Sequence, residues 1–75
     1  MNERFLLYSL RHARPIRAVW MQGDTIVSGN LTVVAMTDDG FRYITARRKK
    51  EPSVMQKKDL LSCGYARGDS GEKEG

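Results

Sequence analysis

The sequence predicts a small, mainly β domain in which one short helix precedes four or five short antiparallel strands. Two observations predict this class. The hydrophobic period changes from helical to alternating after Pro15, and clusters of turn-forming residues then recur at short, regular spacing. A chain of 75 residues fits one domain, and its apolar and charged fractions of 40% and 29% are those of a globular protein.

The helix is predicted over residues 3–12. Leu6, Leu7 and Leu10 fall within one broad face at helical spacing, which favours a helix with one apolar side. Pro15 restricts Arg14 to extended geometry, so the helix should end before residue 14.

The first strand is predicted over residues 16–21, where β-branched and aromatic types alternate between two faces. Residues 22–24, Gln-Gly-Asp, should turn the chain. The next extended segment covers residues 25–37, with an expected bend at residues 28–30, because a glycine inside a strand pattern often marks a bulge.

The second half of the chain predicts a hairpin followed by two shorter segments. Asp38, Asp39 and Gly40 lie between two β-rich runs and are typical of a tight turn. The segments expected after this turn are a third strand at 41–48, a charged turn at 49–52, a fourth strand at 53–57, one helical turn or a strand start at 59–61, and a last strand at 62–66. Residues 68–75 contain only Gly, Asp, Ser, Glu and Lys and are expected to form a disordered polar tail after a single domain at 1–67.

These elements together predict a strongly bent antiparallel sheet. No connection is long enough for the crossover that a parallel pair requires. The first two strands carry apolar side chains on both faces, so one face should fill an interior and the other should meet the helix or another chain. This pattern is typical of an SH3/Sm-like antiparallel barrel with an N-terminal helix.

The charge is positive and unevenly distributed. Thirteen Lys and Arg against nine Asp and Glu give a net charge of +4, and three of the acidic residues lie within residues 69–75. The densest positive feature is Arg47, Arg48, Lys49 and Lys50, followed by Lys57 and Lys58. If these six residues converge at one edge of a hairpin, they can neutralise several phosphates of a nucleic acid or another anionic ligand. Arg17 and Arg42 are lesser candidates for the same surface.

Two alternatives to ligand binding remain open at this stage. Lysines at a sheet edge also keep a domain soluble by blocking aggregation, so the basic residues need no ligand. An apolar strand face can instead make a homo-oligomer of a structural or interaction protein. Phe41 and Tyr43 share one strand face and fit either the core or base stacking, while Trp20 is interpreted as a packing residue.

The sequence contains no constellation that predicts catalysis, a metal or a cofactor, so we expect a protein that is not an enzyme. The single histidine, His12, and the single cysteine, Cys63, cannot supply the three or four ligands of a zinc site. No segment has the length of a membrane span or of a secretion signal, so the cytoplasm is the expected compartment.

The order of these features resembles the WYL domain, an Sm-like SH3 barrel of bacterial regulators. Four segments carry the resemblance: RPIRAVWM at 14–21, NLTVVA at 30–35, FRYITA at 41–46 and DLLS at 59–62. The Trp-Tyr-Leu triplet of the family falls on residues 42–44, Arg-Tyr-Ile. The resemblance implies a barrel and a pocket for nucleic acid or nucleotide-type effectors. The arginines of that pocket fall on Ser53, Gln56 and Asp59, with Lys57 and Lys58 one residue away.

Overall fold

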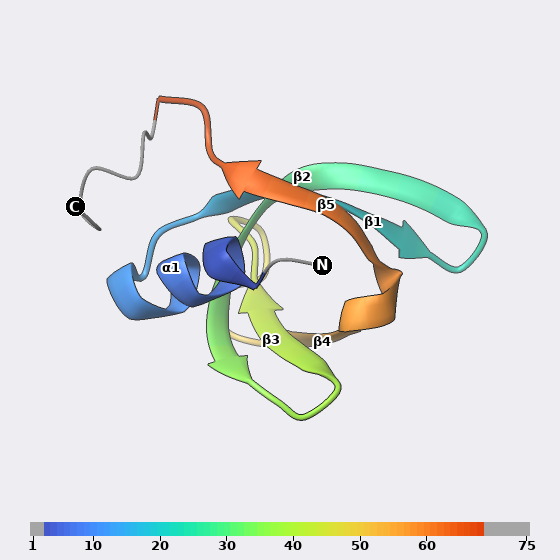
Figure 1. Cartoon of the computed structure of the whole chain (residues 1–75), viewed down its shortest axis with the longest axis horizontal. Coiled ribbons are helices and arrows are strands. Elements are labelled where there is room, and N and C mark those ends of the chain that lie inside the picture. The colour runs from blue at the N-terminus through green and yellow to red at the C-terminus, as the bar shows by residue number, and fades with distance from the viewer. Residues whose placement is uncertain (1–2, 69–75) are drawn as a thin grey trace.

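The computed structural model of the chain describes residues 3–68 and contains a mainly β fold with one helix at its start (Figure 1). Its elements are α1 (Arg4–His12), β1 (Ile16–Gln22), β2 (Thr25–Met36), β3 (Gly40–Ile44), β4 (Ser53–Gln56), the 3-10 turn η1 (Lys57–Asp59) and β5 (Leu60–Tyr65). The predicted tail at 68–75 lies outside the described residues except for Gly68, which belongs to a turn.

The five strands form one antiparallel sheet in the order β4-β3-β2-β1-β5. Consecutive strands from β1 to β4 pair with each other, and β5 returns to pair with β1. Within residues 3–68 the sheet is open, with β4 and β5 as its edges, and η1 joins these two edges through only three residues. The prediction of a mainly β, antiparallel fold with a short N-terminal helix is confirmed.

The second strand differs from the prediction in where it is irregular. It is continuous through Gly29, which pairs with Ala18 in regular register. The irregularity lies between Val33 and Ala35, where the pairing with β3 shifts. The expectation of a bulge that interrupts the strand at 28–30 was therefore wrong. Gly29 instead lies under the Trp20 ring, since a Cβ atom at this position would be 3.8 Å from the indole.

The third strand ends earlier than predicted. It stops at Ile44, and the expected strand residues Arg47 and Arg48 belong to the connection to β4. Pairing between β3 and β4 ends at Tyr43 and Ser53. The residue before Ser53 is Pro52, which has no N–H to continue the ladder.

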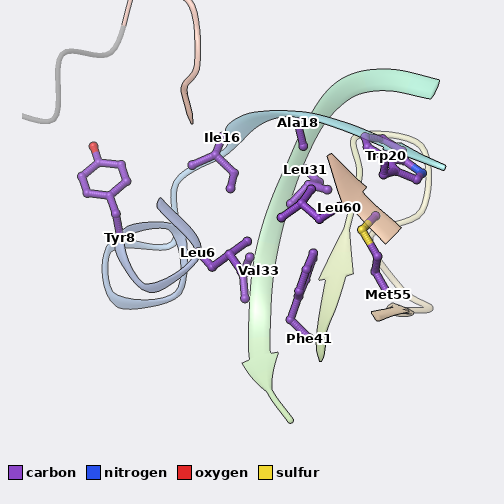
Figure 2. Packing of buried hydrophobic residues seen from close by; sticks show 10 residues of the cluster. All are labelled: Leu6, Tyr8, Ile16, Ala18, Trp20, Leu31, Val33, Phe41, Met55 and Leu60. Atoms are coloured by element: carbon purple, nitrogen blue, oxygen red, sulfur yellow. The ribbon is translucent and has the colours of Figure 1, made fainter. Parts of the chain in front are cut away.

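The core lies on the inner face of the sheet and under the helix (Figure 2). Ile16, Ala18 and Trp20 of β1 point inward in strict alternation and are buried. The remaining buried apolar residues are Leu6, Tyr8, Leu31, Val33, Phe41, Met55 and Leu60. The helix and every strand contribute to this cluster, which explains how so short a chain builds one core.

A buried serine attaches the helix to the sheet. β1 pairs with β2 only as far as Ile16 and Leu31, so the next stretch of β2 has no strand neighbour on that side. There the Val33 N–H donates a 2.8 Å hydrogen bond to Ser9 Oγ, and the Ser9 hydroxyl donates a 2.6 Å bond to the Arg14 carbonyl. Ser9 therefore provides the hydrogen-bond acceptor that a neighbouring strand would otherwise provide to β2. Its second hydrogen bond fixes the chain where it leaves α1.

Candidate anion-binding site

The largest group of unpaired cations lies in the connection between β3 and β4, residues 45–52, which we call the basic loop. Its four cationic residues, Arg47 to Lys50, are all exposed. The Arg48 N–H donates a 3.1 Å hydrogen bond to the Thr45 carbonyl, which tightens the loop into a turn. Within residues 3–68 no carboxylate forms a salt bridge with any of the four cations. The loop therefore concentrates positive charge that the described protein does not neutralise.

Lys57 and Lys58 lie at the opposite end of the β3–β4 hairpin. Gly40 pairs with Gln56, and the Lys57 N–H donates a 2.8 Å hydrogen bond to the Asp39 carbonyl. The four residues of β4 thus carry the chain from the basic loop to the β2–β3 turn before Lys57 is reached. The expectation that all six cations converge on one edge was wrong, because the strand between them separates the two groups.

The two lysines at this end also differ from each other. The Lys57 ammonium forms a salt bridge and hydrogen bond with the Glu3 carboxylate, next to the start of α1, and is only partly exposed. Lys58 is exposed. Lys57 thus has a structural partner within the domain, which favours a role in helix attachment over ligand binding.

Arg17 and Arg42 project from the outer face of the sheet. Their strand neighbours Ala18 and Phe41 point inward, so alternation turns both arginines away from the core. Arg17 lines a shallow hollow with Ser62 to Tyr65 of β5. The structure therefore does not place these two residues in the same hollow as the basic loop.

An aromatic pocket of about 290 Å³ lies beside the basic loop and connects it to the core. We call this hollow the aromatic pocket, and the residues that line it are Trp20, Gln22, Tyr43, Thr45, Arg48 and Ser53. Trp20 is 8% exposed, and Tyr43 is half-buried. A larger, more open hollow of about 540 Å³ is lined only by residues 46–51 of the loop itself. The aromatic pocket combines one cation with two aromatic rings and side-chain hydroxyl groups.

Sequence reasoning did not assign this pocket, although it named several of its residues. Trp20 was interpreted as packing, and its burial agrees with that, but the same ring also forms a pocket wall. Gln22, Thr45 and Ser53 gave no signal of their own. They come from three different segments, and only the pairing of the strands brings them around Tyr43.

The remaining reactive side chains are isolated from one another. Cys63 is a free, half-buried thiol, and burial raises its pKa above the ordinary value. His12 packs against the Tyr8 ring on α1. Among residues 3–68 no three His, Cys, Asp or Glu side chains lie close enough to hold a metal ion. In the same part of the chain no helix has the length and apolarity to cross a membrane.

Comparison of the chain with models of known protein families, with curated proteins and with solved structures finds no match.

Proposed function

We propose that the chain is a small SH3/Sm-like barrel module that binds nucleic acid or a nucleotide-type anion through the basic loop. The observation that carries this proposal is the set of four exposed cations without a carboxylate partner in the described chain, next to a pocket with two aromatic rings. Cations without partners favour an anionic ligand because binding releases the counterions that both surfaces hold. The resemblance to the WYL domain implies the same class of ligand, but it supports the barrel better than the binding, because the arginines of that family's pocket fall on Ser53, Gln56 and Asp59.

The barrel part of the proposal is supported by the strand order. The two edge strands follow each other in sequence and are connected by η1, so little chain separates them. A bulge at Val34 of β2 and another at Leu61 of β5, opposite Val19 and Trp20, increase the twist of the sheet. Such devices are what a small sheet needs in order to curl on itself.

The test is the binding of a labelled single-stranded RNA or DNA to the full chain at about 50 mM salt and above. We expect affinity that falls steeply as salt rises. Replacing Arg47 and Arg48 together by Ala should lower the slope of log K against log salt by about 1.4, because each lost phosphate contact on a single strand removes about 0.7. Arg11 and Arg67 are exposed cations elsewhere in the chain, so the double change R11A/R67A is the control for the same loss of charge.

Two results would contradict the proposal. One is the absence of any binding by the wild-type chain at the lowest salt concentration. The other is an equal loss of affinity in the loop variant and the control variant, since that result would assign binding to net charge instead of to the loop.

The exposed apolar residues of the edge strands favour a second candidate function, self-association into a homo-oligomer. Val54 of β4 is 64% exposed and Leu61 of β5 is 50% exposed. Neither edge has a strand neighbour within residues 3–68, and an open edge can pair with another chain. A sedimentation mass above that of one chain, which persists at high salt and falls in V54K and L61K, is the expected result. A strictly monomeric profile at micromolar concentration would rule this candidate out.

A further inference from the structure

We propose that the aromatic pocket binds one unpaired nucleobase while the adjoining phosphate lies on the basic loop. This inference rests on the proposed function. It concerns the base of the ligand, which the charge of the basic loop cannot recognise. Its basis is the arrangement of Trp20, Tyr43 and Arg48 around one hollow.

The two rings of the pocket form a rigid corner. The Trp20 and Tyr43 ring centroids are 6.2 Å apart and the rings are inclined at 58°, so a flat ligand cannot be sandwiched between them. Tyr43 also packs against Phe41, with centroids 6.0 Å apart. Because Phe41 is fully buried, the position of the Tyr43 ring is fixed before a ligand arrives. A base therefore stacks on Tyr43 and meets Trp20 at its edge.

The Trp20 indole N–H faces away from the core and is accessible to a ligand. Figure 2 shows the indole nitrogen on the side of the ring away from Leu31 and Leu60. The described chain provides this N–H with no hydrogen-bond partner, yet no buried polar side-chain atom among residues 3–68 is unsatisfied. The N–H therefore keeps contact with solvent, and the pocket that Trp20 lines is where a ligand acceptor can reach it.

The polar residues of the pocket match the edge of a base. The Gln22 amide and the Thr45 and Ser53 hydroxyls each contain both a donor and an acceptor. Unpaired bases are recognised by stacking combined with hydrogen bonds to such groups along their exposed edges. The residues that line the pocket include no carboxylate, which is consistent with an electron-rich, anionic ligand.

Size and charge complete the match. A volume of about 290 Å³ is at the lower limit of small-molecule sites, so it admits one ring system and excludes a base pair. The flat Arg48 guanidinium can stack on a base or donate two hydrogen bonds to a phosphate. Arg47, its neighbour in the loop, does not line the pocket. The structure thus provides a matched pair of arginines with the same charge and different positions.

The test measures binding of two labelled RNA strands of about twelve nucleotides, which fits the usual footprint of a small single-strand binder. One strand is intact, and the other has the same phosphates but carries abasic sites. We expect the intact strand to bind wild type about tenfold more tightly. Tyr43→Leu should remove this difference, and Tyr43→Phe, which keeps the ring, should preserve it. Arg48→Ala should reduce the difference more than Arg47→Ala.

Competition identifies the source of the base. Displacement of the strand by a nucleoside monophosphate assigns a free nucleotide, whereas displacement by single-stranded RNA alone assigns a nucleic acid; either outcome supports the pocket. Thermal unfolding of each variant verifies folding, and if Tyr43→Leu does not fold, the comparison of the two arginine variants decides.

Equal binding of the intact and abasic strands to wild type would overturn the inference and leave the proposed function in place. Equal losses in the two arginine variants on both strands would do the same. Failure of every strand to bind would overturn both proposals.

Discussion

The two ends of the β3–β4 hairpin both carry cations, but only one end neutralises them. At the η1 end, Lys57 pairs with Glu3, and its N–H is bonded to the Asp39 carbonyl. At the other end, the basic loop has four exposed cations and no salt bridge within the described chain. The difference shows that the number of positive charges in a segment does not reveal which of them are neutralised within the domain.

The surroundings of the two hairpin ends explain why only one of them neutralises its cations. The η1 end lies next to the start of the helix, where the salt bridge between Lys57 and Glu3 joins η1 to the residue before α1. The basic loop spans eight residues between short strands and lines the aromatic pocket and a more open hollow. Charges in such a loop repel one another, and relief of this repulsion by an anionic ligand is the reason that we propose binding at this end.

The largest expected effect comes from breaking the hairpin that separates the two ends. A Cβ atom on Gly40 would lie 1.9 Å from the Met55 carbonyl oxygen and 2.9 Å from the Gln56 Cα. Because both atoms belong to the backbone of β4, Gly40→Ala should destabilise the domain by about 3 kcal/mol or more, as measured by urea unfolding. Gly64→Ala is the control, since no atom lies within 4 Å of its Cβ position. Similar stability in the two variants would contradict the tight β3–β4 approach.

A smaller loss is expected from the serine that attaches the helix. Ser9→Ala leaves the Val33 N–H without its acceptor in a buried place, and an unsatisfied buried group costs about 1–3 kcal/mol. Urea unfolding of the variant should show this loss, while Ser62→Ala, at an exposed position on β5, should leave stability nearly unchanged. A wild-type unfolding midpoint in the Ser9 variant would show that the Ser9 hydrogen bond is not needed to hold α1 against the sheet.

The two adjacent lysines of η1 allow a direct comparison of a paired cation with an exposed one. Lys57→Ala should destabilise the domain by about 0.5 kcal/mol at low salt, because the pair with Glu3 is partly exposed and therefore screened. Lys58→Ala should have a smaller effect on stability. Both changes should weaken RNA binding less than Arg48→Ala does. If either lysine variant loses as much affinity as Arg48→Ala, the η1 end belongs to the binding surface.

The smallest effect concerns Cys63. Burial raises its pKa above the ordinary value of 9.0, so the folded protein retains the thiol proton at a pH where the unfolded chain has released it. Stability from this source is complete below pH 9.0 and is lost as pH rises from there through the folded pKa. The urea midpoint of wild type should therefore fall more between pH 8 and pH 10 than that of Cys63→Ala. Equal falls would show that the thiol is not desolvated.

The sequence predicted most of the sheet because its local signals agree. The alternation predicted at residues 16–21 and the Asp-Gly turn before Phe41 both appear in the structure, where the first strand extends to Gln22. A bulge in β2 was predicted at Gly29, but Gly29 pairs regularly with Ala18, and the register shift lies between Val33 and Ala35. The site was harder to predict. The charges of the basic loop are evident in the sequence, but the pocket beside them requires knowledge of which strands pair.

The sequence by itself determined the helix, the strand periodicity and the concentration of charge in residues 47–50, because each depends on neighbours a few positions away. Tertiary structure decided which cations are neutralised and which rings line a hollow. Glu3 and Lys57 lie 54 positions apart in the chain, so no local sequence pattern can relate them. Strand register sets such contacts, and a shift of one residue would turn Tyr43 from the inner face to the outer.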